Sequence, residues 1–363
     1  MTASGVKTLL LSRYGGKLAL ALTIGALGGA VFHHWRLPLA WMIGAMVATA
    51  AAAIGGVRLA VPKPFRNTMV VILGVLLGGA FNPAVVAQVG AWLASLAALA
   101  PYVMIATALG LLYLRRVGGY DAATAFFTAT PGGLSEMTVV GGAWGGDESA
   151  IALSHGLRVM LVVITVPVWF RLTHGDPAAL AGARSTLPGP ALSALSVTEW
   201  SLLAGCALGA PLARLARIPA YFLVGPMLLS ALVHGLGVSA VQPPGALVAA
   251  AQVVVGTAVG CRFTGVGVRT LGRSAVLAIG LTTLLLGLTL TLALTLHHAT
   301  GLDLGALILA FTPGGLTEMS LIALSLGLDV AFVSTHHILR IMMIVALAPL
   351  AFALWVRLGK RAA

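Results

Sequence analysis

One stretch of this chain occurs twice. Residues 127–138 read FTATPGGLSEMT, and residues 309–320 read LAFTPGGLTEMS. The two copies lie 182 residues apart, and the same offset pairs other polar residues of an otherwise apolar chain: Asp121 with Asp303, Asp147 with Asp329, His155 with His337 and Arg158 with Arg340. A fixed offset of this kind is the signature of an internal repeat. We therefore interpret the repeated motif as the functional centre of a duplicated chain.

The composition is that of a membrane protein. Of the 363 residues, 59% are hydrophobic and only 8% are charged, with a mean hydropathy of +1.04. About a quarter of the residues of a soluble domain are charged, so the chain is predicted to cross a membrane several times. The net charge of +12 comes from Lys and Arg between apolar runs. With no basic helix or soluble domain, direct nucleic-acid binding is not expected.

The duplication divides the chain into two halves. We expect a first membrane repeat over 1–172, a linker over 173–198 and a second membrane repeat over 199–363. Each half contains five apolar runs, and most are long enough to cross ~30 Å of hydrocarbon. The runs are 17–35, 37–57, 66–84, 88–114 and 149–172, then 198–213, 218–238, 246–264, 274–297 and 329–356.

The segment that carries the motif, 121–144 in one half and 303–326 in the other, is interrupted by Pro-Gly-Gly. If it crosses, alternating the loops places 13 Lys and Arg inside and 6 outside; if it re-enters, the numbers become 16 and 3. The positive-inside rule favours the second arrangement. The prediction is an all-α fold of two inverted repeats, each with five transmembrane helices plus a re-entrant segment, both termini cytoplasmic, and Arg36, Arg171 and Arg184 outside.

The Pro-Gly-Gly breaks predict a binding site. A backbone broken inside a membrane must face protein or water, and inverted-repeat transporters use such half-helix ends to bind substrates and ions. Free amides at the start of the second half-helix favour an anion. The alternative is a helix that begins at Pro with Thr as its cap. The candidate residues are Thr130, Pro131, Gly132, Gly133 and Ser135 with Thr312, Pro313, Gly314, Gly315 and Thr317.

Two glutamates follow the breaks. Glu136 and Glu318 each lie five residues after the Pro of their motif. A carboxylate within a membrane usually faces a cavity or a partner. Each residue is therefore a candidate proton or cation site, or a ligand for an amine. The alternative is a first-turn acid that complements the helix dipole, with or without an arginine partner.

Two arginines and two histidines lie inside long apolar runs. Arg158 and Arg340 are predicted either to clamp an anionic substrate or to form structural ion pairs with the glutamates. His155 and His337 lie three residues before them, on the same helix face, and are candidates for proton relay.

Metal, redox and enzyme signals are weak. Cys206 and Cys261 give neither a disulfide framework nor metal-ligand spacing, and no carboxylate–histidine cluster has ligand spacing. No catalytic fingerprint is present. We expect no cofactor and no enzymatic activity.

The doubled TPGGL[ST]EM motif resembles that of the bacterial membrane AbrB family, also called the AbrB duplication proteins, over essentially the whole chain. The resemblance implies a multi-pass protein of the bacterial inner membrane. Members are variously labelled as transcriptional regulators or as ammonia monooxygenases, and the family supplies no agreed substrate.

From the sequence we expect a secondary transporter or exporter of a small polar or charged metabolite, with a homo-oligomer as a possible assembly. Two alternatives remain: a membrane protein that regulates gene expression indirectly, and a membrane monooxygenase.

Overall fold

The computed structural model describes residues 3–174 and 190–361, with side chains for 15–173 and 190–357, and all regular structure there is helical. Arg184 and most of the expected linker lie outside the described residues. The first half contains α1 Ala3–His34, α2 Ala40–Ile54, α3 Lys63–Gly78, α4 Pro83–Ala87, α5 Leu93–Arg116, α6 Ala122–Ala129, α7 Leu134–Ala143 and α8 Glu148–His174. The second contains α10 Val197–Ala207, α11 Gly209–Leu215, α12 Tyr221–Gly235, α13 Gly245–Gly260, α14 Val268–Thr300, α15 Leu304–Phe311, α16 Leu316–Ser325 and α17 Val330–Arg361. Single turns of 3₁₀ helix, η1 Val89–Trp92, η2 Leu192–Ala194 and η3 Cys261–Phe263, complete the described structure.

All ten apolar runs form helices, but they differ in length. Six helical segments within the described residues are long and apolar enough to cross a membrane: 15–34, 89–116, 148–173, 245–263, 268–300 and 330–357. The others are shorter than the sequence suggested. Helices α2 and α12 have 15 residues each, which corresponds to about 22 Å at 1.5 Å per residue. Crossing by the short helices stays a prediction.

One of the ten runs is divided, against expectation. Residues 198–213 form α10 and α11, whereas the equivalent part of the first half is the single helix α1. Pro211 lies in the first turn of α11, where its missing amide and its ring do not permit a bond to the preceding turn. The corresponding residue in α1 is Ala30, so only the second half carries this break.

The two halves pack through reciprocal contacts. In α3, Gly74 lies so close to α12 that a Cβ atom there would collide with the Leu223 carbonyl oxygen. In α13, Gly256 approaches α2 in the same way, against the Met42 carbonyl. Gly256 and Met42 are the sequence twins of Gly74 and Leu223. Each half therefore presents the same pair of surfaces to the other, as the subunits of a two-fold symmetric dimer do.

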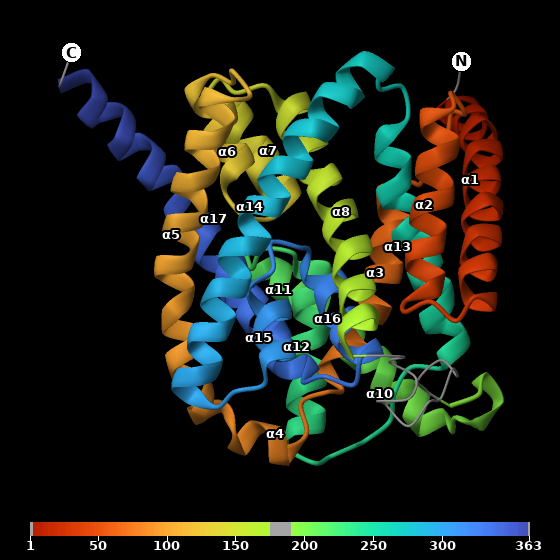
Figure 1. Ribbon diagram of the computed structural model, residues 1–363. Coiled ribbons are helices and arrows are strands. Elements are labelled where there is room, and N and C mark those ends of the chain that lie inside the picture. The colour runs from red at the N-terminus through yellow and green to blue at the C-terminus, as the bar shows by residue number, and fades with distance from the viewer. Residues whose placement is uncertain (1–2, 175–189, 362–363) are drawn as a thin grey trace.

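Aspartates fix the start of the helices around the motif. Asp121 accepts a hydrogen bond from the Thr124 amide at 2.9 Å, and its twin Asp303 accepts one from Ala306 at 2.7 Å. Asp147 and Asp329 cap α8 and α17 in the same manner. Both chain ends lie in the upper part of Figure 1, with α6 and α7 in the upper half of that view and α15 and α16 in the lower half.

Candidate functional site

The motif breaks one helix into two short ones in each half. Helix α6 ends at Ala129, and α7 begins at Leu134 after an extended Thr130-Pro131-Gly132-Gly133 segment. The Thr130 hydroxyl donates back to the Phe126 carbonyl at 2.8 Å, and Thr312 donates to Ile308 at 2.7 Å. The threonines therefore satisfy carbonyls at the end of the first half-helix.

The two glycines make room for the residues that complete the motif. A Cβ atom on Gly132 would crowd Met137, and one on Gly314 would crowd Met319. Both methionines are fully buried. The second glycine of each pair, Gly315 for example, faces the carboxylate of the glutamate three residues later. Each glutamate thus folds back over the start of its own helix, where the helix dipole favours a negative charge.

The arginines hold the other side of each break. Arg340 donates to the carbonyls of Phe311, Thr312 and Gly314 at 3.3, 2.8 and 3.0 Å. In the first half, Arg158 donates to the Thr128 carbonyl at 3.4 Å. These carbonyls lie at the end of the first half-helix or just after it, where no further helical turn supplies donors. The Thr312 carbonyl also accepts the Gly314 amide at 2.8 Å. The two arginines are 3% and 1% exposed, so each break is closed by a buried cation.

The histidines orient these arginines. His155 Nε2 lies 2.9 Å from the Phe127 carbonyl, and Arg158 lies 2.9 Å from its Nδ1. His337 repeats this arrangement, with Leu309 and Arg340 at 2.9 and 2.8 Å. A carbonyl only accepts and a guanidinium only donates, so Nε2 carries the proton and Nδ1 accepts. Both ring nitrogens are occupied, and a proton relay would require one of these bonds to break.

The Arg–Glu ion pair considered from the sequence does not form. Among the side chains described over 15–173 and 190–357, neither glutamate is hydrogen-bonded or ion-paired to Arg158 or Arg340. The reason is geometric. The arginines donate to backbone carbonyls at the carboxyl ends of α6 and α15, whereas the glutamates lie at the amino ends of α7 and α16.

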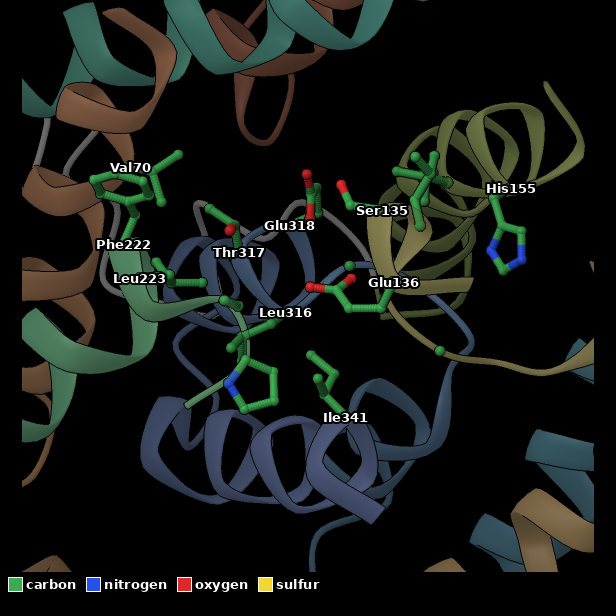
Figure 2. A pocket seen from close by; sticks show the side chains of 18 of the residues that line it. Val70, Ser135, Glu136, His155, Phe222, Leu223, Leu316, Thr317, Glu318 and Ile341 are labelled. Carbon is green, nitrogen blue, oxygen red and sulfur yellow. The ribbon is translucent and has the colours of Figure 1, made fainter. Parts of the chain in front are cut away.

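Both copies of the motif border one cavity of about 520 Å³. Figure 2 shows Glu136 and Glu318 near its centre, with Ser135 and Thr317 beside them. Four candidate residues do not line this cavity: Thr130, Thr312, Pro313 and His337. The other twelve do, namely Pro131, Gly132, Gly133, Ser135, Glu136, His155, Arg158, Gly314, Gly315, Thr317, Glu318 and Arg340.

Three further cations line the cavity and were not among the candidate site residues. Lys63 and Arg66 reach it from α3, and Arg262 reaches it from η3. A signal for them was present in the sequence. Arg262 corresponds to Ala80 in the first half, so it is one of the few charged residues of the apolar regions without a twin. In the sequence, all three belong to the 16 Lys and Arg assigned to the cytoplasmic side.

A second cavity of about 860 Å³ adjoins the first, since Leu134 and Arg262 line both. Ala150 and Ser274 also border this second cavity. Their twins in the opposite half are Phe332 and Trp92. These two rings are buried and pack edge to face at 5.5 Å between centroids.

Polar contacts reinforce this aromatic pair. His336 Nε2 and the Ser95 hydroxyl form a hydrogen bond of 2.9 Å. The centroid of the His336 ring lies 4.1 Å from that of the Phe332 ring. The twins of His336 and Ser95 are Ser154 and Leu277. The second cavity beside α8 therefore has no open counterpart beside α17, because Trp92 and Phe332 fill the equivalent position.

These observations define a class: an all-helical membrane protein with two broken helices around a basic central cavity. A family model described as "Transition state regulatory protein AbrB" matches residues 41–356, and the chain belongs to this AbrB family. It is 27% identical to "Uncharacterized protein YhjN" of Bacillus subtilis over 90% of both chains. It is 25% identical to "Putative regulator AbrB" of Escherichia coli over 92% of both chains. Within the described residues, no group of three or more His, Cys, Asp or Glu side chains is placed to hold a metal ion.

Proposed function

We propose that this protein is a secondary transporter of the bacterial inner membrane that carries a small polar or charged metabolite. The observation that carries the proposal is the single cavity bordered by both copies of the broken motif. Transporters built from repeats bind substrates and coupling ions at such helix breaks, where the two repeats meet.

An inverted repeat with ten crossings is the architecture we infer for it. The reciprocal glycine contacts support a two-fold relation between the halves. The positions of α6–α7 and α15–α16 in opposite halves of Figure 1 support an axis in the membrane plane. The distribution of Lys and Arg, with 16 on one side and 3 on the other, supports cytoplasmic termini.

Within this proposal the motif residues have separate roles. Arg158 and Arg340 hold the broken ends in place through carbonyl contacts. Glu136 and Glu318 face the cavity and couple transport to protons or bind a cationic group. A substrate anion and the glutamate carboxylate would both be attracted to the amino end of the second half-helix. Protonation of the glutamate would remove its negative charge there and favour the substrate anion.

The test is flux through reconstituted liposomes. A thermal-stability panel of succinate, glutamate, phosphate, ammonium and putrescine first selects the compound to be followed. Replacing both glutamates, Glu136→Gln with Glu318→Gln, is expected to abolish flux while the melting temperature stays close to that of the parent. Full flux in the double variant would show that the carboxylates do not couple transport.

A second candidate function is indirect regulation of gene expression. The family description and the Escherichia coli relative's name both contain the word "regulatory" or "regulator". A transporter would act in this way by changing the level of a metabolite that a separate regulator senses. Transcript changes on deleting the gene should then be reproduced by the flux-deficient double variant. Normal transcript levels in that variant would instead point to a partner bound by the protein itself.

A further inference from the structure

The charges around the cavity are strongly unbalanced. Its lining includes five cationic side chains but only two carboxylates, Glu136 and Glu318. Arg158 and Arg340 are bonded to carbonyls, which leaves three cations without such partners: Lys63, Arg66 and Arg262. None of these three side chains makes a hydrogen bond or ion pair in the part of the chain that the structure describes. Lys63 and Arg262 are exposed to the cavity, and Arg66 is half-buried.

The glutamates do not neutralise these cations. Each carboxylate lies against the glycine that precedes its own helix. Glu318 is near enough to Arg262 to interact with it electrostatically, but the two do not form an ion pair. The Nε atoms of Arg158 and Arg340 also have no hydrogen-bond partner, but both are buried away from the cavity.

The same cavity has an apolar wall. Val70, Phe222 and Leu223 lie together in Figure 2, and Ile341 lies across from them. Small-molecule sites typically combine such apolar walls with a few polar groups that fix orientation. The carbon skeleton of a ligand could pack against these apolar side chains, and negatively charged oxygens could pair with the cations beside them. A cationic body would instead be placed among three like charges.

We propose that the cavity binds a small organic anion, with its carboxylate groups paired to Lys63, Arg66 and Arg262 and its carbon skeleton against the apolar wall. This inference rests on the proposed transport function and names the substrate class for the same cavity. It assigns anion recognition to three residues outside the duplicated motif. The motif then supplies the frame of the site and the two carboxylates.

Binding to the purified full-length protein in detergent tests the substrate class. Succinate, phosphate and putrescine are titrated separately at constant ionic strength, with isothermal calorimetry as the readout. Succinate is expected to bind, and Arg262→Gln to weaken it at least about tenfold, because a charge partner in a desolvated site is lost. Arg262→Lys should retain part of the affinity. Arg116→Gln, at the exposed end of α5, is the matched control and should bind as the parent does.

The outcomes separate the inference from the proposed function. Binding of putrescine without succinate would overturn the anion class. Unchanged succinate affinity in Arg262→Gln would overturn the assignment of anion recognition to this arginine. Phosphate binding that depends on Arg262, without succinate binding, would reject the organic skeleton. Succinate bound but not moved across liposomes would retain the site and reject transport. Putrescine flux without anion binding would retain transport and reject the site. Unchanged elution of Arg262→Gln in size-exclusion chromatography confirms that it is folded.

Discussion

Each residue of the duplicated motif has a distinct physical task. The threonine bonds the carbonyl four residues earlier, and the proline prevents the helix from continuing. The first glycine accommodates the buried methionine, and the second accommodates the glutamate side chain. The sequence showed the proline break directly. It did not show that the arginine 27 residues after the proline completes the break, because that contact depends on how α8 and α17 pack.

At this scale we predict that Arg340→Leu strongly destabilises the protein. The substitution removes the arginine donor from the carbonyls of Phe311 and Gly314, and one of the two donors from that of Thr312. Unpaired buried groups of this kind each cost about 1–3 kcal/mol, so we expect a total loss of roughly 3 kcal/mol or more. The melting temperature in detergent measures it.

The matched comparison is Arg116→Leu, which removes an exposed arginine from the end of α5. Its melting temperature should stay near that of the parent. An equal, small shift in both variants would show that the carbonyl contacts of Arg340 do not hold the break together.

Between elements, glycine sets how closely the halves approach. Helices α3 and α12 meet at Gly74, and α13 and α2 meet at Gly256, each time with backbone against backbone. Small residues permit this contact in membrane proteins. The two contacts are sequence twins, so a change at either place should have a similar cost.

We therefore predict that Gly74→Ala and Gly256→Ala each destabilise the protein by about 1–3 kcal/mol, because the new methyl group must push two backbones apart. Gly272→Ala in α14 is the control, since a Cβ atom there meets nothing within 4 Å. That substitution should stabilise by about 0.5–1 kcal/mol. Thermal unfolding of the three variants in one detergent gives the comparison. Losses that differ widely between the two glycine twins would argue against equivalent packing.

The helices were predictable to different degrees. Apolar runs and Pro-Gly-Gly breaks are local signals, and both half-helix pairs formed where the motif placed them. Length was less predictable, because α2 and α12 end where turns between helices begin rather than where hydrophobicity ends. The division of α10 from α11 follows Pro211, which has no twin and was hidden by the apolar run around it.

At the scale of the whole molecule, the two similar halves differ in one region, which is a cavity on one side and is filled by side chains on the other. The second cavity is open beside Ala150 and Ser274, whereas Phe332 and Trp92 fill the equivalent place. The site was predictable where residues are duplicated, as for both glutamates and both arginines. It was missed at Lys63, Arg66 and Arg262, because their position in the cavity depends on packing between the halves.

We predict that Trp92→Ser opens a cavity at the position now filled by Trp92 and Phe332. Removing a buried tryptophan costs about 3–5 kcal/mol, and the residue then matches its twin, Ser274. The measurement uses a chain without Cys206 and Cys261 in which Ser95→Cys reports access to a polar thiol reagent. Ser95 is fully buried, so the reporter should react slowly until Trp92 is replaced.

Ser149→Cys is the positive control, because Ser149 is exposed and lines the open second cavity. It should react at the same rate with or without Trp92. Rapid labelling of Ser95→Cys in the presence of Trp92 would contradict the view that the aromatic pair closes this region.

The reciprocal contacts between the halves also bear on how such a chain can diverge. A protein assembled from two separate copies of one half would carry every substitution twice, once in each symmetry-related position. An arginine acquired at the position of Arg262 would then also stand in place of Ala80, and a tryptophan at Trp92 would also replace Ser274. Joining the copies in one polypeptide releases each position from its counterpart. Fusion thus permits one cavity to acquire an arginine while the equivalent place in the other half is filled by aromatic side chains.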